Sequence, residues 1–307
     1  MDIFDAVVYV IAAVVLFMHG LHGFASDLQA RGGTVLRTVL ASATRSKARG
    51  FVLGTAATAI MQSSSAITAI TVGLVAAGLV DFRSSLAILL GANVGTTATA
   101  WLVSFKLTGI GRYLLVAGTV LGALPVRAAV LGKPIFYLGF ILFALNLISD
   151  AIGPLRAHPA TLELLALSQN AYLGVAVGVL ATALLQSSSV TIGIGILLTQ
   201  QGPLDAAHVV PIVVGANLGT TVTGLLARIG LDVEARRAAV ANTLFNVIGV
   251  VAFLPVLAPF SQGVVWLIGN PQMAVAWAHL IFNLVAAALG FLLLQRIVAW
   301  STRIVPA

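Results

Sequence analysis

Two short runs of neutral polar residues interrupt the apolar sequence, and both offer the same hydrogen-bonding groups. Gln62-Ser63-Ser64-Ser65 and Gln186-Ser187-Ser188-Ser189 lie 124 residues apart. Each hydroxyl donates and accepts hydrogen bonds, and each glutamine amide offers two donors and an acceptor. A helix starting after each run, at Ala66 or Val190, would add free N–H groups and the positive end of its dipole. Together these groups would bind an anion without a formal positive charge.

The same two runs also offer oxygen atoms to a cation. The helix that precedes each run would end there with free carbonyl groups. Carbonyl, amide and hydroxyl oxygens suit a hard cation such as Na⁺. Thr58 and Thr182, also 124 residues apart, precede the glutamines by four residues and would lie one helical turn away. For these threonines the spacing leaves two roles open, membership of the site and hydrogen bonding to their own helix.

A second shared phrase follows each run at the same offset. Gly91-Ala92-Asn93-Val94-Gly95-Thr96-Thr97 corresponds to Gly215-Ala216-Asn217-Leu218-Gly219-Thr220-Thr221. We expect a discontinuous helix in each copy, loosened by its two glycines and facing the same cavity with Asn and Thr oxygens. The alternative is that small residues only permit close helix packing. Packing does not require the repeated glutamines and asparagines, so the phrases favour a binding site.

The composition predicts that this site lies inside a membrane. Hydrophobic residues make up 60% of the 307 residues and charged residues only 8%, with a mean hydropathy of +1.08. These values exclude a water-soluble domain. The net charge of +7 comes from basic residues between apolar segments, where they set topology, so nucleic-acid binding is not expected. There is no cysteine, which excludes disulfides and thiolate metal sites.

The apolar segments divide the chain into helices of spanning length and shorter pieces. Met1–Asp5 is acidic and no cleavage site follows the first apolar run, so that run is expected to remain as a helix. A basic loop is expected from Arg31 to Arg49. The predicted spans are Ala6–Asp27, Ser84–Phe105, Gly109–Val130, Pro134–Ile152, Ala206–Ala227, Arg237–Leu257 and Gln272–Ile297.

The segments around each Gln-Ser-Ser-Ser run are too short to span. Gly50–Met61 and Ala66–Val80 would be about 18 and 22 Å long, against about 30 Å of hydrocarbon. A re-entrant hairpin with the polar run at its tip fits these lengths, and a single broken crossing fits less well. Hairpins give three crossings per unit and therefore inverted repeats, whereas broken crossings give parallel repeats. The Lys and Arg distribution is equally asymmetric in both arrangements and does not choose between them.

The two paired phrases resemble those of the type II sodium–phosphate cotransporter family, and the resemblance extends from about Leu16 to Phe291. It implies an all-α polytopic membrane protein with two inverted repeats, whose re-entrant hairpins meet near mid-membrane. It also implies Na⁺-coupled symport of inorganic phosphate across the cytoplasmic membrane. The expected repeats are residues 1–132 and 133–258, followed by an extra C-terminal helix in 259–307. The expected partners are phosphate, Na⁺ and the lipid bilayer, and a homodimer is compatible with this interpretation.

The resemblance implies the phosphate-binding residues, and the oxygen chemistry of the repeated motifs supplies the candidate Na⁺ ligands. The phosphate-binding residues are Gln62, Ser63, Ser64, Ser65, Gln186, Ser187, Ser188 and Ser189, with Asn93 and Asn217 nearby. The candidate Na⁺ ligands are Gln62, Gln186, Asn93, Asn217, Thr58, Thr182, Thr96, Thr97, Thr220 and Thr221.

Other functions fit the sequence less well than phosphate symport. A passive phosphate or anion channel, or an exporter that does not use sodium, remains the alternative. An intramembrane serine hydrolase is not expected, because the serine runs lack a G-x-S-x-G setting and no mid-span carboxylate could orient a histidine. The same lack of carboxylates argues against a carboxylate proton relay. His19, His22 and His279 have no partners at metal-ligand spacing, so we expect structural or solvated roles for them.

Overall fold

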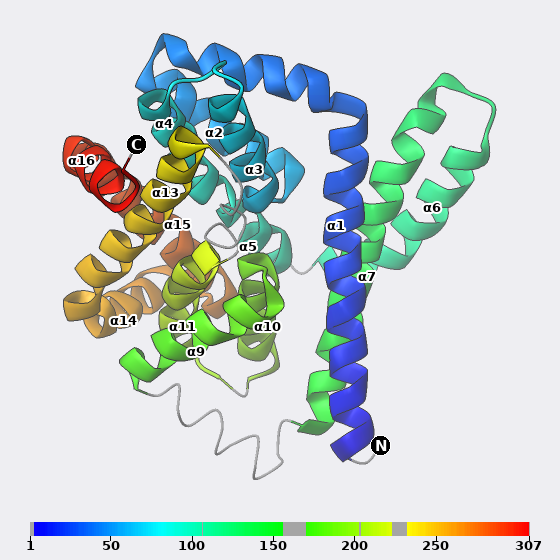
Figure 1. Cartoon of the computed structure of the whole chain (residues 1–307). Coiled ribbons are helices and arrows are strands. Elements are labelled where there is room, and N and C mark those ends of the chain that lie inside the picture. The colour runs from blue at the N-terminus through cyan, green and yellow to red at the C-terminus, as the bar shows by residue number, and fades with distance from the viewer. Residues whose placement is uncertain (1–2, 106, 156–169, 203, 223–231, 307) are drawn as a thin grey trace.

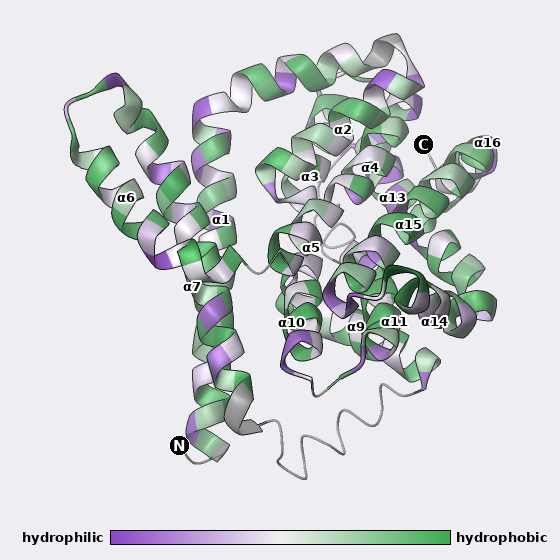
Figure 2. Ribbon diagram, turned by 180° about the vertical axis from the view of Figure 1, so that it is seen from behind, coloured by the Kyte–Doolittle hydropathy of each residue, from purple (hydrophilic) through white to green (hydrophobic). Residues whose placement is uncertain are grey.

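The computed structural model describes residues 3–105, 107–155, 170–202, 204–222 and 232–306. Within these ranges the elements are helices and no strand occurs, and hydrophobic residues predominate along them (Figure 2). Five helical segments of the described part are long and apolar enough to cross a membrane: Phe4–Ala41, Phe82–Ser104, Arg127–Ile152, Val233–Ile268 and Pro271–Leu292. The prediction of an all-α protein with several apolar spans is confirmed.

Helix α1 is longer than the first predicted span. It runs from Ile3 to Ala41, so the predicted basic loop is wrong for Arg31 and Arg37, which lie inside it. No proline interrupts this stretch, and Arg31 pairs with Asp27 at 2.7 Å one turn earlier, which supports the helix beyond the apolar residues. The helix bends in its C-terminal third (Figure 1). Gly32 and Gly33 follow one another in that third, and consecutive small residues are a common cause of bending.

The rest of the predicted basic loop is also helical. The 3₁₀-helix η1 (Ser42–Arg45) follows α1 directly, and Lys47 and Arg49 lie in the first turn of α2. Ser46 separates η1 from α2, and its hydroxyl accepts a hydrogen bond from the Arg49 N–H at 3.1 Å. A capped helix start takes the place of the loop because the serine satisfies one of the free N–H groups of the first turn.

The repeated sequence phrases fall on two matching sets of helices. The first set comprises α2 (Lys47–Met61), α3 (Ser64–Ala76), α4 (Phe82–Gly95) and α5 (Thr97–Ser104). The second set comprises α9 (Ala171–Leu185), α10 (Ser188–Gln201) and α11 (Ala206–Gly219). In Figure 1, α2 and α3 occupy the upper part of the molecule, and α9 and α10 occupy the lower part.

Glycines bring the helices of each set into close contact. A Cβ atom added to Gly91 would overlap the Phe51 carbonyl oxygen of α2, and one added to Gly215 would overlap the Val175 carbonyl oxygen of α9. Gly95 contacts α2 in the same manner, and its counterpart Gly219 contacts α9. These glycines are therefore close-packing positions four residues apart, as in other small-xxx-small contacts, which is the alternative that the sequence left open.

The helix break predicted in the second phrase is slight. Helix α4 ends at Gly95 and α5 begins at Thr97, while Thr96 keeps a nearly helical backbone with φ −59° and ψ −24°. Thr220 has almost the same values, φ −61° and ψ −25°. The two copies thus share their local conformation as well as their packing.

Helices α6 and α7 form a pair beside α1 (Figure 1). After η2 (Leu107–Ile110), α6 runs only from Gly111 to Ala123, so the predicted span Gly109–Val130 is wrong. The cause is Pro125, because the residue before a proline is disfavoured in helical conformation. The chain continues through η3 (Arg127–Leu131) into α7 (Gly132–Leu155).

The C-terminal part contains more helices than the single one predicted for 259–307. Helix α13 (Val233–Phe253) and η5 (Leu254–Val256) lead into α14 (Leu257–Ile268), α15 (Pro271–Leu292) and α16 (Leu294–Ile304). The predicted span Gln272–Ile297 is therefore divided at Leu293. Helix α16 is tied back to α13, because the Arg237 Nε donates to the Val305 carbonyl oxygen at 3.0 Å.

The largest buried cluster joins the N-terminal helix to the second repeat. Phe17 of α1, Leu145 of α7 and Val190 of α10 are each fully buried in it. Burial of a large apolar side chain stabilises the fold by about 1.5 to 3 kcal/mol. This cluster holds α1 against the helix that starts at the second serine run.

Candidate functional site

Each Gln-Ser-Ser-Ser run forms a tight turn between two helices. Gln62 follows α2 with φ 53° and ψ 24°, and Gln186 follows α9 with φ 54° and ψ 24°. They are the two residues other than glycine with positive φ in the described part of the chain. A left-handed conformation at a residue with a side chain is uncommon and tends to occur at functional sites. Its repetition at equivalent glutamines shows that the two turns are built alike.

The first serine of each run starts the next helix. Ser63 and Ser187 have extended backbones, and their hydroxyls accept hydrogen bonds from the N–H groups of Ala66 at 3.2 Å and Val190 at 3.4 Å. These are N-cap interactions, which satisfy one of the free N–H groups of a helix start. Each sequence run therefore encodes a helix stop, one left-handed residue and a capped helix start.

The two turns meet at one cavity of about 360 Å³. All eight residues of the two runs line it, together with one face of α1 and Thr220. The remaining lining residues are Met18, Leu21, His22, Ala25, Leu184 and Leu185. The runs are 124 residues apart in sequence, and the fold brings them to the same place.

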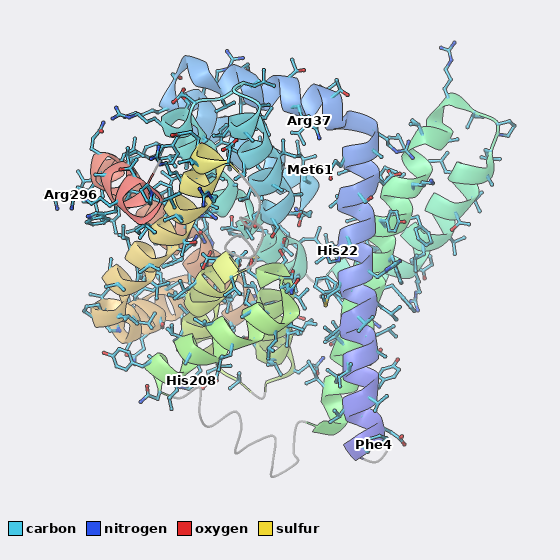
Figure 3. The ribbon with its side chains drawn as sticks, in the orientation of Figure 1. Phe4, His22, Arg37, Met61, His208 and Arg296 are labelled. Atoms are coloured by element: carbon cyan, nitrogen blue, oxygen red, sulfur yellow. The ribbon has the colours of Figure 1, made fainter. Side chains whose placement is uncertain are left out.

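The cavity is lined by neutral groups apart from one histidine. None of its described lining residues is an Asp, Glu, Lys or Arg. His22 of α1 is its ionisable residue, and it lies about midway along the molecule in Figure 3. The hydroxyls of Ser64, Ser65 and Ser188 make no hydrogen bond within the described residues, so they are available to a ligand. No sequence pattern indicated His22, because its position depends on how α1 packs against the two turns.

A threonine outside the predicted site connects the two runs. Thr99 Oγ1 donates to Gln62 Oε1 at 2.7 Å and lies 3.2 Å from Ser189 Oγ. It is 2% exposed, so both contacts are shielded from solvent. A sequence signal for it existed, because Thr223 stands 124 residues later. Thr223 lies outside the described residues.

The two asparagines of the second phrase do not line this cavity. Asn217 is buried, and its Nδ2 donates to the Val213 carbonyl oxygen of its own helix at 2.9 Å. Asn93 is half-buried on α4. Their assignment to the phosphate site stays a prediction.

The predicted threonine ligands have different environments. Thr96 and Thr220 each donate to the carbonyl oxygen four residues earlier at 3.0 Å, and Thr220 also lines the cavity. Thr221 donates to the Leu218 carbonyl oxygen at 2.7 Å. Thr97 is buried at the start of α5.

Thr58 and Thr182 are buried one helical turn before the glutamines and do not line the cavity. Thr182 donates to Thr191 Oγ1 of α10 at 2.9 Å. Thr58 is fully buried, and its hydroxyl has no hydrogen-bond partner within the described residues. Neither threonine therefore hydrogen-bonds to its own helix, which was one of the two roles that the sequence left open. An unpaired buried hydroxyl costs about 1 to 3 kcal/mol.

Comparison with known proteins agrees with the two-copy architecture. The family model described as Na+/Pi-cotransporter matches residues 16–150 and again residues 157–296. The protein YqeW of Bacillus subtilis is 29% identical over 282 residues, which cover 91% of each chain. No solved structure matches.

Further relatives carry names that mention phosphate. YjbB of Salmonella typhimurium, named as a candidate inorganic phosphate export protein, is 31% identical over 90% of this chain, which spans only 52% of that protein. The human sodium-dependent phosphate transport protein 2B is 33% identical over 137 residues, 41% of this chain and 20% of that protein. The chain belongs to the Na⁺/Pi-cotransporter family, a family of transporters and not of enzymes.

Proposed function

We propose that this protein is a secondary transporter that moves inorganic phosphate across the cytoplasmic membrane together with Na⁺. The observation that carries the proposal is the cavity lined by both Gln-Ser-Ser-Ser turns, whose described residues include no Asp, Glu, Lys or Arg. Its free hydroxyls, from Ser64, Ser65 and Ser188, would donate to phosphate oxygens. The N-termini of α3 and α10 would add N–H donors and positive dipole ends.

Sodium would stabilise the bound phosphate by its charge. A phosphate dianion in a neutral cavity of low dielectric is costly alone, and a cation bound nearby offsets that charge. The buried Thr58 hydroxyl, unpaired within the described residues, is a candidate oxygen ligand for that cation. Coupling follows if the state that exchanges between the two sides is reached only with both ions bound.

The two repeats are proposed to be inverted, with each motif segment a re-entrant hairpin. Helices α2, α3, α9 and α10 contain 15, 13, 15 and 14 residues, about 20 to 23 Å each, short of the roughly 30 Å hydrocarbon core. Their placement in opposite halves of the molecule supports hairpins that enter from opposite faces (Figure 1). The repeat boundaries at 132 and 258 and a homodimeric assembly stay predictions.

Export is the second candidate, and the name of YjbB favours it. Because this chain spans about half of that protein, the activity of the whole relative transfers only as a proposal. A symporter runs in the direction of its combined gradients, so phosphate efflux alone does not exclude sodium coupling. The two candidates differ in whether flux depends on Na⁺.

Uptake driven by separate ion gradients tests the sodium coupling. Purified protein in liposomes should accumulate ³²P-phosphate under an inward Na⁺ gradient and not under an inward proton gradient without Na⁺. The reason is that no carboxylate is among the described cavity residues, so no proton can neutralise a carboxylate there in place of Na⁺. The uptake rates are corrected for the change in the ionisation of phosphate itself with pH. Robust accumulation with the proton gradient alone would require a different coupling mechanism.

The bridging threonine gives a second prediction. Thr99→Val keeps the shape of the side chain but removes the hydroxyl between Gln62 and Ser189. Because each lost hydrogen bond costs about 0.5 to 1.5 kcal/mol, we expect loss of both contacts to lower transport about 5- to 150-fold. Thr99→Ser restores the hydroxyl and should retain most of the activity. Equal initial rates of Na⁺-driven uptake in wild type and the valine variant would show that the bridge is not needed.

A further inference from the structure

One face of α1 runs past three cavities in succession. Met18, His22 and Ala25 line the cavity between the two turns. Gln29 and Arg37 line two further cavities of about 490 and 580 Å³, which share these residues and Thr34. The residues stand about four apart along a helix, so they lie on the same face. The cavity-lining residues of α1 therefore extend from the site toward the C-terminal end of the helix.

Helix α3 forms a second wall along the same line. Its first residues, Ser64 and Ser65, line the cavity between the turns. Residues of the next turns, between Ala66 and Gly73, line the cavity of about 580 Å³, which Arg37 and Thr38 of α1 also line. Helices α1 and α3 thus both line the cavity between the turns and the cavity of about 580 Å³.

The outer end of this path carries a positive charge without an acidic partner. Arg37 is the charged residue among those lining the two outer cavities, and within the described residues it forms no ion pair. Arg31, less than two turns earlier, has both an acidic partner and a backbone acceptor. It pairs with Asp27 at 2.7 Å and donates to the Val130 carbonyl oxygen at 2.7 Å. Arg37 lies near the top of the molecule in Figure 3.

We infer that the groove between α1 and α3 is the access route by which a small inorganic oxyanion reaches the site, and that Arg37 attracts the anion at its mouth. The inference rests on the proposed phosphate transport for the identity of the anion. A cation at the mouth of a cleft raises the local anion concentration and the association rate. Below Arg37, Thr34 and Gln29 of α1 supply neutral polar groups to one wall, and the α3 wall consists of small and apolar residues that offer an anion nothing to bind.

Gly33 keeps the route open at the bend of α1. It lines one of the outer cavities, and a Cβ atom added there would meet only the Gln29 Cγ, at 3.7 Å. A larger side chain would therefore extend into the route without colliding with the backbone. Gly32 has nothing within 4 Å of an added Cβ and lines none of the three cavities, so it is a matched control.

Cysteine labelling tests the route without any transport assay. The chain has no cysteine, so Ala25→Cys places a single thiol in the inner cavity. In nanodiscs, we expect an anionic methanethiosulfonate to react about tenfold faster than a cationic one of similar size at low ionic strength. Arg37→Gln should bring this ratio close to one, whereas Arg83→Gln, which removes an exposed charge outside the three cavities, should not.

Blocking the groove supplies the second arm of the test. Gly33→Met, combined with Ala25→Cys, should slow the reaction of both reagents with the introduced thiol severalfold, and Gly32→Met should not. Gly33→Ala replaces Gly33→Met in this comparison if the methionine variant does not fold. An unchanged reagent ratio in Arg37→Gln, or unchanged labelling in the folded Gly33 variants, would overturn the inference.

Phosphate uptake separates failure of the route from failure of the proposed function. In Arg37→Gln, we expect the KM for phosphate to rise several-fold with little change in kcat, because the arginine acts on approach and not in the site. If wild-type protein transports no phosphate, the proposed function fails while labelling still reports the route. If uptake is normal but its KM is the same in both arginine variants, the role assigned to Arg37 is wrong.

Discussion

Ser188→Ala and Ser64→Ala are each expected to weaken phosphate binding about 10- to 150-fold, because a hydrogen bond to a charged group contributes about 1.5 to 3 kcal/mol. These hydroxyls come from opposite turns, line the same cavity and are free of hydrogen bonds within the described residues. Ser63 and Ser187 make less informative targets, since their hydroxyls already cap α3 and α10. Loss of either free hydroxyl should leave the fold intact.

The measurement is phosphate affinity in the presence of Na⁺, with thermal unfolding as a check on folding. Ser261→Ala is the matched control, because Ser261 is buried in α14 and donates to its own helix, at Leu257, away from the cavity. Wild-type affinity in a folded Ser188 variant would contradict the assignment of that hydroxyl. An equal loss in the Ser261 variant would point to a general destabilisation.

Gly91→Ala and Gly215→Ala are expected to cost at least about 3 kcal/mol of folding free energy, the upper range of overpacking effects. In each case the added methyl would overlap a backbone carbonyl oxygen, at Phe51 or Val175, and a backbone atom moves only if the helices separate. The paired helices carry the two turns, so separation would also disrupt the site.

Thermal unfolding in detergent checks this prediction against Gly263→Ala. Gly263 lies in α14 with nothing within 4 Å of an added Cβ, so the alanine there should be neutral or slightly stabilising, since Gly costs about 0.5 to 1 kcal/mol in a helix interior. Unfolding temperatures of the Gly91 and Gly215 variants that match this control would show that the tight packing is dispensable.

The turns of the site could be predicted because their information is local and repeated. A polar run with a helix-capping serine, flanked by segments too short to span, specifies a break wherever it occurs. The constant offset of 124 residues then indicates two equivalent copies. Thr99 and Thr223 are also 124 residues apart, so the sequence held a signal for the threonine that connects the two turns.

Other features depend on tertiary packing, which hydropathy does not report. The apolar part of α1 ends near Asp27, yet the helix continues to Ala41 because the Arg31–Asp27 pair supports it outside the apolar segment. His22 and Arg37 line cavities because of how α1 packs, which no local pattern in the sequence specifies. For the glycines of the second phrase, the sequence allowed both a loosened helix and a close contact, and only the neighbouring helix decides between them.

Binding stoichiometry tests most directly whether the two repeats build one phosphate site. Equilibrium dialysis of the purified protein with ³²P-phosphate should give one Na⁺-dependent phosphate per chain, with binding weakened by Ser64→Ala and by Ser188→Ala alike. Two phosphates per chain, each sensitive to only one of these substitutions, would contradict the shared cavity.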